Sequence, residues 1–290
     1  MHKWVRFCLA FINFWVYSGI HLGVCVFLFT KYICIYLGLQ VLPEYMFFIG
    51  AATICTYSLH RYLGPRNSFY LFDNDGANQY VWKKNYNLIV FGLFFLLLLA
   101  IFVRYFIGYF ILLLPPSFIT LFYLFQFPGL GKTLKQLPYL KTLLIPFVFV
   151  WVVVLIPAFI QGQMSEQPIS LSTTLWVFIF VFAITLPFDV RDQYFDKKEG
   201  IKTLAHYLGT MNSVLLSISL LFTIQVVQFL LWLSHRIEVL HFAVMICVLL
   251  ITMLMIRKSA TRSDDIFFYL YLDGSLSFFY GFYFALKWLF

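Results

Sequence analysis

Charged residues are scarce in this sequence. Only 11% of its 290 residues are charged, whereas 62% are hydrophobic. Soluble domains carry about 25% charged and about 45–50% apolar residues, so this composition excludes an ordinary soluble domain. The apolar residues form blocks long enough to cross a hydrocarbon core, which takes roughly 20 helical residues. These blocks are apolar on every face, and the short alternating segments of a β-barrel are lacking.

Paired cysteines are lacking too. The five cysteines are scattered through apolar segments without a CxxC pair, which favours small apolar side chains over disulfides, zinc ligands or haem attachment. The histidines also lack the spacing of metal ligands. The net charge of +8 is spread over short loops between apolar blocks, as membrane topology requires, so nucleic acid is not an expected partner.

The apolar blocks predict an all-α polytopic membrane protein with nine transmembrane helices in a single domain, residues 1–290. The predicted spans are approximately 8–30, 43–60, 87–103, 106–126, 142–160, 173–190, 213–233, 238–256 and 266–288. Only Arg104 and Tyr105 separate the third span from the fourth. Eight spans, one of them a long bent helix, is therefore the alternative.

The positions of Lys and Arg test this count, because cytoplasmic loops are enriched in them. If the N-terminus is cytoplasmic, 16 of the 20 Lys and Arg residues lie on the cytoplasmic side. The four on the outer side are Lys31, Arg104, Arg236 and Lys287. The bias predicts a cytoplasmic N-terminus, an outer C-terminus and, in a bacterium, location in the plasma (inner) membrane. The loop after the sixth span is then cytoplasmic.

Three carboxylates gather where the sixth span ends. Asp189, Asp192 and Asp196 follow the spacing i, i+3 and i+7, so a continuing helix places them on one stripe. Such a stripe at a membrane interface needs cations. Arg191 and the lysines that follow lie on other faces of the helix, so Mg²⁺, which binds carboxylate and phosphate oxygens, is the expected partner. The alternative is a solvated charged loop that only enforces topology.

The segment around these carboxylates resembles the second aspartate-rich motif of the UbiA-type intramembrane prenyltransferases. It reads Arg191-Asp192-x-x-x-Asp196-x-x-x-Gly200-Ile-Lys202-Thr203-Leu-Ala-x-x-Leu-Gly209. The resemblance implies a bundle of nine transmembrane helices with cytoplasmic active-site loops. It also implies Mg²⁺-dependent transfer of an isoprenoid chain from a prenyl diphosphate to a lipophilic, commonly aromatic, acceptor within the membrane lipid. Asp192 and Asp196 then hold the metal with Asp189 beside them, and Lys202 joins Asp192 and Asp196 as a catalytic residue.

The family's first motif, Asn-Asp-x-x-Asp at the cytoplasmic end of the second span, is lacking. That place reads Thr-Tyr-Ser58-Leu-His60-Arg61-Tyr, and no carboxylate lies between residues 44 and 73. The predicted topology puts Ser58, His60 and Arg61 opposite the acidic stripe, so we expect them to bind the diphosphate with Lys202 and Arg191. Arg61 can do so bidentately. The alternatives are that His60 and Arg61 only anchor the helix, and that the acidic turn at 73–76 supplies a compensating ligand.

Two other functions remain open at this point. A divergent family member could bind an isoprenoid or lipid diphosphate without transferring it, as the missing first motif suggests. A small transporter is also compatible with polytopic architecture, but transporters tend to place ionisable groups near mid-membrane. Here most acidic residues cluster at one cytoplasmic face. Asp273, inside the ninth span, is the exception, and we expect it to face the bundle interior. The sequence specifies neither acceptor, prenyl chain length nor oligomeric state.

Overall fold

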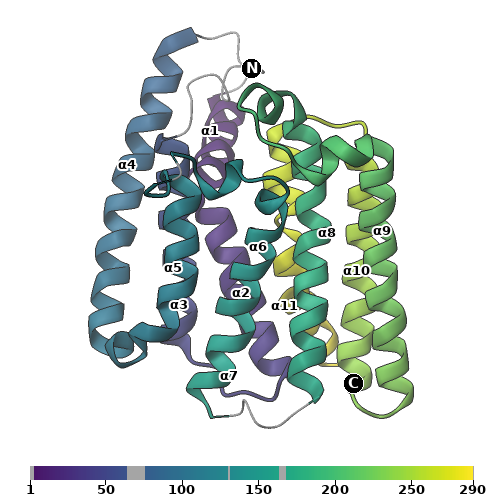
Figure 1. Ribbon diagram of the computed structural model, residues 1–290. Coiled ribbons are helices and arrows are strands. Elements are labelled where there is room, and N and C mark those ends of the chain that lie inside the picture. The colour runs from purple at the N-terminus through teal and green to yellow at the C-terminus, as the bar shows by residue number, and fades with distance from the viewer. Residues whose placement is uncertain (1–2, 64–75, 130, 163–167, 290) are drawn as a thin grey trace.

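The computed structural model describes residues 3–63, 76–129, 131–162 and 168–289, and these residues form helices but no strand (Figure 1). The α-helices are α1 (Lys3–Tyr17), α2 (Ile20–Tyr36), α3 (Pro43–Leu63), α4 (Gly76–Ile101), α5 (Phe110–Leu124), α6 (Leu140–Val150), α7 (Ile156–Ile160), α8 (Pro168–Lys198), α9 (Leu204–Leu233), α10 (Val239–Ser259) and α11 (Ser275–Leu286). Short π-helices lie at Phe102–Phe106, Trp151–Leu155 and Phe267–Leu272, and 3₁₀ turns at Ile107–Tyr109 and Leu134–Gln136. The predicted all-α membrane architecture is confirmed. The acidic turn at 73–75 lies outside the described residues.

Five stretches among the described residues are long and apolar enough to cross a membrane. They are Asn85–Leu124, Leu140–Ile160, Leu171–Lys198, Leu204–Leu233 and Val239–Ser259. The bent pair Ala10–Tyr17 and Ile20–Tyr36 gives a sixth if it is counted as one span. The protein is therefore an integral membrane protein, and the count of nine crossings stays a prediction.

The first predicted span is not one helix. The chain bends by 59° between α1 and α2, at Ser18 and Gly19. Gly19 has a φ of +80°, a left-handed conformation that glycine adopts without steric cost. A Cβ at Gly19 would also lie 3.0 Å from the Cβ of Tyr57 on α3. The predicted span 8–30 therefore contains a bend, which the sequence pattern does not show.

The third and fourth predicted spans are separate helices. Figure 1 shows that α4 and α5 run in opposite directions, joined through the residues between Ile101 and Phe110. Phe106 and Tyr109 have non-helical backbone angles within this connection. The alternative of one long bent helix is thus excluded. The side chains of Leu93, Leu96 and Ile111 in these helices are exposed, as expected of a lipid-facing surface.

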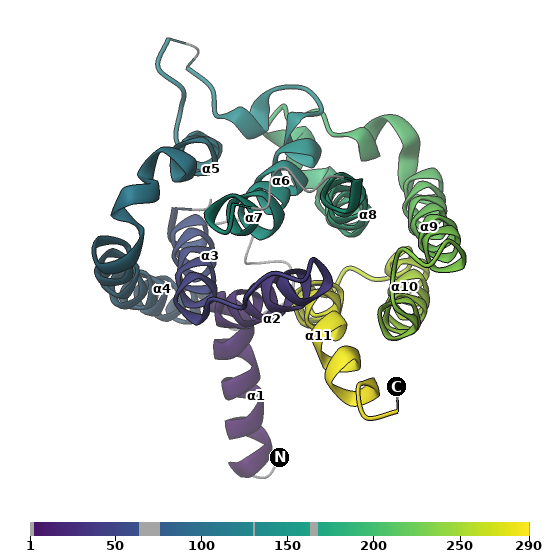
Figure 2. The same ribbon diagram turned by 90° about the horizontal axis from the view of Figure 1, so that it is seen from below.

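The helices pack around the bundle axis in an order that brings distant segments together. α6 packs on α8, α8 on α9, α9 on α10, α10 on α11, α11 on α2, α2 on α3 and α3 on α4, which Figure 2 shows from below. Phe29 of α2, Phe180 of α8 and Phe279 of α11 are fully buried in mutual contact at its centre. This aromatic core holds α2, α8 and α11 together. Because α3 packs on α2 and α6 packs on α8, the end of α3, the start of α6 and the end of α8 border a common space.

Candidate active site

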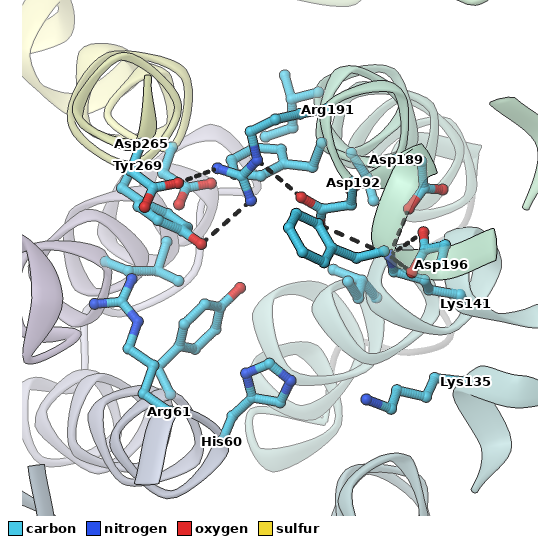
Figure 3. Close-up of a pocket in the computed structure, with 18 of the residues that line it drawn as sticks. His60, Arg61, Lys135, Lys141, Asp189, Arg191, Asp192, Asp196, Asp265 and Tyr269 are labelled. Atoms are coloured by element: carbon cyan, nitrogen blue, oxygen red, sulfur yellow. Dashed lines mark hydrogen bonds and ion pairs between the residues drawn. The ribbon is translucent and has the colours of Figure 1, made fainter. Parts of the chain in front are cut away.

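One cavity of about 600 Å³ opens among these helix ends. Its wall includes His60 and Arg61 from α3, Lys141 from α6 and Asp192 from α8 (Figure 3). Asp265 and Tyr269 contribute from the segment that precedes α11. The topology predicted that the end of α3 faces the acidic stripe, and the structure places Arg61 and Asp192 on this shared cavity.

The acidic stripe lies on a continuous helix, as the spacing predicted. α8 extends through Asp189, Asp192 and Asp196 and ends at Lys198. Gly200 follows with a φ of +70°, and the Ile201 amide donates to the Asp196 carbonyl at 2.7 Å. This left-handed glycine cap ends the helix two residues after its third aspartate.

A protein cation that the sequence analysis did not assign sits at the centre of the stripe. The Lys141 ammonium lies 2.7 Å from Asp196, 3.4 Å from Asp189 and 3.8 Å from Asp192. Its side chain is only 12% exposed. Thr142 donates a further hydrogen bond to Asp189. The sequence feature that could have identified Lys141 is a single lysine at the start of an apolar span, on the same predicted side of the membrane as the acidic stripe.

The position of Lys141 follows from the connection before α6. Tyr139 takes a left-handed conformation, with a φ of 62°, and caps the start of α6. Its amide donates to the Lys202 carbonyl at 2.8 Å, which joins this connection to the segment after α8. Two helix ends far apart in the sequence are therefore held side by side, and Lys141 points into the acidic stripe (Figure 3).

Arg191 also neutralises the stripe, contrary to the expectation that it lies on an unrelated face. Its guanidinium donates to Asp192 at 2.9 Å, to Asp265 at 3.1 Å and to the Tyr269 hydroxyl at 3.2 Å. Helical spacing considers only α8, whereas Asp265 and Tyr269 approach from another part of the bundle. Arg191 lines the cavity, but its guanidinium nitrogens already donate to these three side chains.

Arg61 is held at the cavity wall by the bend between α1 and α2. One of its terminal nitrogens donates to the Val16 carbonyl at 2.9 Å, and its guanidinium carbon lies 4.5 Å from the centre of the Tyr269 ring. His60 lines the same cavity. The Arg61 guanidinium also lies 5.2 Å from the centre of the Tyr17 ring, and the Tyr17 hydroxyl donates to Asp265 at 3.3 Å. Arg61 therefore contacts the Tyr17 ring, while Asp265 accepts from the Tyr17 hydroxyl. Arg61 thus reaches the cavity without an ion pair of its own among the described residues.

Two predicted diphosphate ligands lie elsewhere. Ser58 is fully buried and donates to the Ser18 carbonyl at 2.7 Å, so it joins α3 to the bend after α1 and does not line the cavity. The Lys202 side chain is exposed and is also outside the lining. Both residues belong to segments that border the site, but the directions of their side chains depend on the local backbone.

The carboxylates fit a metal that arrives with a phosphate better than a resident ion. Among the described residues, no group of three His, Cys, Asp or Glu side chains is arranged to hold a metal. Lys141 and Arg191 occupy several carboxylate oxygens. Mg²⁺, however, is commonly held by one or two carboxylates plus phosphate oxygens and waters. Asp192 and Asp196 match that smaller donor set.

The balance of charge in the wall supports the same conclusion. Its cationic side chains are Arg61, Lys135, Lys141 and Arg191, and its carboxylates are Asp189, Asp192, Asp196, Glu199, Asp264, Asp265 and Asp273. A polyphosphate anion that entered would meet more negative than positive side chains. Divalent cations bound with it would offset that repulsion.

A comparison with protein families decides the classification. The model of the UbiA prenyltransferase family matches residues 84–281. The chain belongs to the UbiA prenyltransferase family. The matched segment contains the acidic stripe and Lys141, whereas His60 and Arg61 precede it. This limit agrees with the missing first motif.

Two solved structures are similar to this chain over most of its length. A digeranylgeranylglyceryl phosphate synthase structure is 12% identical with a TM-score of 0.49, over 95% of this chain and 96% of that chain. The apo structure of a UbiA homologue from Aeropyrum pernix K1 is 13% identical with a TM-score of 0.48, over 96% and 98%. No curated protein matches the chain.

Proposed function

We propose that this protein transfers an isoprenoid chain from a prenyl diphosphate to an aromatic or other lipid-soluble acceptor within the membrane, with Mg²⁺ as cofactor. The observation that carries the proposal is the division of the cavity into two zones. Charged side chains line the cavity where α3 ends, where α6 begins and where α8 ends. Phe149, Val181 and Leu276 also line it, and each lies two or more helical turns farther along the chain from these charged positions. A prenyl diphosphate has the same division between an anionic head and a hydrocarbon chain.

The head would bind between Arg61 and the acidic stripe. Arg61 and His60 offer hydrogen-bond donors from α3, and Lys141 offers an ammonium from α6. Charge-assisted bonds of this kind contribute about 1.5–3 kcal/mol each. Arg191 already holds Asp192, Asp265 and Tyr269, so its part is to fix the wall and to add positive potential. Ser58 and Lys202 are left out of this site.

Asp192 and Asp196 would hold Mg²⁺ against the diphosphate, with Asp189 behind them. When bound, the metal supplies charge that stabilises the departing diphosphate. Arg61 and Lys141 act in the same direction by binding its oxygens as negative charge develops. Tyr57 and Phe149 line the cavity, and their rings would stabilise the allylic cation.

The test is a transfer assay on the purified protein. The protein receives Mg²⁺ and labelled prenyl diphosphates of several lengths, with membrane extract as the source of acceptors. We expect a labelled lipid product that falls at least a hundredfold in Asp192→Asn and in Asp196→Asn. Glu238→Gln is the matched control, because Glu238 is an exposed carboxylate in the connection between α9 and α10.

The outcomes separate the competing functions. Tight binding of the diphosphate without product from any acceptor contradicts transfer and supports a binding protein, which the lack of the first acidic motif makes the second candidate. Absence of both binding and product removes both. A product that persists unchanged in the two aspartate variants would show that transfer occurs without the stripe. The proposed orientation places the charged end of the cavity on the cytoplasmic side, which in a bacterium is the inner face of the plasma membrane.

A further inference from the structure

Asp273 is a buried carboxylate that the binding of a diphosphate does not use. It is 8% exposed and lines the cavity. Its side chain makes no hydrogen bond or ion pair with any residue in the described part of the chain. An ionisable group inside a membrane bundle is costly to bury, so an unpartnered one facing a cavity indicates a site for a ligand. The missing partner is a hydrogen-bond donor or a cation.

The backbone around Asp273 is specialised. The residues before it, Phe267–Leu272, form a π-helix, and the Asp273 amide donates to the carbonyl of Phe268, five residues earlier, at 3.1 Å. Such π-turns occur frequently at functional sites. A Cβ on Gly274 would lie 2.3 Å from the Leu270 carbonyl oxygen, so only glycine fits the following position without a backbone shift. These two features set the direction of the Asp273 side chain.

Asp273 lies between charged and apolar residues of the cavity wall. Tyr269, one turn earlier, contacts both Arg61 and Arg191 at the charged end of the cavity. Asp273 follows Tyr269 by four residues and precedes Leu276, an apolar residue of the same cavity wall, by three. The groups that interact with its charge are Arg61 and Tyr57 on α3, Arg191 on α8 and Cys25 on α2. It therefore sits between the zone of the diphosphate and the zone of the hydrocarbon.

We propose that Asp273 is a catalytic base that binds the hydroxyl group of the acceptor and takes its proton. This inference rests on the proposed transfer function and names its acceptor class as an alcohol or a phenol. In the step, the bond from C1 of the prenyl chain to the diphosphate oxygen breaks, and its electron pair leaves with the diphosphate. C1 bonds to the acceptor oxygen, or to a ring carbon conjugated with it. In the second case the resulting dienone loses the hydrogen of that ring carbon as a proton, and its oxygen regains a proton to restore the phenol. The hydroxyl proton passes to the Asp273 carboxylate.

The contrasting role is structural, with Asp273 only balancing the charge of Arg61 and Arg191. The two roles differ in what the Asp273→Asn variant changes. The amide keeps the shape and one acceptor oxygen but cannot take a proton. A lost base lowers kcat for transfer, whereas a lost balancing charge changes the KM for the prenyl diphosphate, because the cavity becomes less negative.

The experiment measures transfer and acceptor-independent release of diphosphate in the same preparation of the full chain, with a purified alcohol or phenol as the probe acceptor. Diphosphate release reports the fraction of folded protein that ionises the substrate, so the ratio of transfer to release does not depend on how much protein folds. We expect Asp273→Asn to lower this ratio about 100-fold or more, within the range for general bases. The KM for prenyl diphosphate stays within about twofold, since Asp273 does not bind it.

Two further comparisons sharpen the result. Asp273→Glu keeps a base on a longer stem, so its ratio is expected between those of the wild type and Asp273→Asn. Transfer by Asp273→Asn should also rise steeply with the acidity of the acceptor hydroxyl, because a more acidic phenol loses its proton without help. Glu238→Gln is the control and keeps the wild-type ratio.

Each outcome decides one of the two proposals. An unchanged ratio in Asp273→Asn, or a change confined to the KM for prenyl diphosphate, overturns the role of Asp273 and leaves transfer intact. A wild-type protein that binds prenyl diphosphate but makes no product from any hydroxyl acceptor overturns the proposed function itself.

Discussion

Lys141 shows how three carboxylates can share one buried helix face. Two of them, Asp189 and Asp196, are almost completely buried, and like charges so close together would repel strongly. The ammonium of Lys141 lies within 3.8 Å of all three. It takes the place that the sequence analysis gave to a metal. Binding a diphosphate with Mg²⁺ would then exchange some of these internal contacts for contacts to the substrate.

We expect Lys141→Met to be strongly destabilising, because it leaves the three carboxylates without their central cation. Removal of one partner from a buried ion pair typically costs about 3–5 kcal/mol. The measurement is the free energy of unfolding by SDS titration in mixed micelles. Added Mg²⁺ should stabilise the variant more than the wild type, since the vacated position favours a cation.

The control for this change is Lys135→Met. Lys135 faces Glu199 at 3.8 Å, with side chains 21% and 36% exposed, and such pairs contribute about 1 kcal/mol or less. Equal stability of Lys141→Met and Lys135→Met would contradict the central role of Lys141.

Irregular helix positions place the side chains of the site. The bend at Gly19 turns α1 away from α2 and presents the Val16 carbonyl to Arg61. The π-helix at Phe267–Leu272 and Gly274 direct Asp273. By contrast, α8 is continuous, and its regular spacing is what aligns the acidic stripe. The regular helix α8 thus forms one wall of the cavity, and the irregular backbone near Gly19 and Gly274 positions side chains on the other walls.

The Gly274→Ala variant tests whether the π-helix at Phe267–Leu272 positions Asp273. Its added methyl group would lie 2.3 Å from the Leu270 carbonyl oxygen, so the π-turn must shift and take Asp273 with it. We expect a loss of stability of about 1–3 kcal/mol, typical of overpacking, and a fall in transfer activity. Thermal unfolding in detergent and the transfer assay measure the two effects.

The matched control lies on the adjoining helix. A Cβ at Gly281, inside α11, meets nothing within 4 Å, so Gly281→Ala should be neutral or stabilise by about 0.5–1 kcal/mol. If both alanine variants behave alike, the π-turn does not hold Asp273 in place.

The whole molecule presents its charged cavity at one end of an apolar bundle. The cavity is formed by helices that are adjacent only after the chain has packed around the bundle axis, as Figure 2 shows. The bias of Lys and Arg predicts which end faces the cytoplasm. The connection between α9 and α10 and the connection after α10 lie at opposite ends of the bundle (Figure 1).

This orientation predicts sided labelling of introduced cysteines. Ser234 and Thr261 are exposed in these two connections, and Cys8 is the exposed native cysteine among the described residues. In a Cys8→Ser background, Ser234→Cys should react with an impermeant maleimide in intact cells. Thr261→Cys should react only after lysis, because its loop carries the cytoplasmic bias. The reverse pattern would invert the topology and place the cavity on the outer side.

The sequence alone determined the class of protein and one wall of the site. Composition requires a membrane environment, because apolar blocks of this length cannot remain in water. The spacing of Asp189, Asp192 and Asp196 fixes their common face, since it depends only on helical periodicity. The resemblance of the same segment identified the family. All of these properties are local or compositional.

Tertiary structure alone decided the partners of those carboxylates. Lys141 meets the stripe because α6 packs on α8, and Arg191 bridges to Asp265 because the segment before α11 closes the cavity. Arg61 faces inward and Ser58 does not, because the bend at Gly19 puts a different carbonyl beside each. These are contacts between residues distant in sequence, and side-chain direction at a bend or a π-turn follows from packing that no linear spacing encodes.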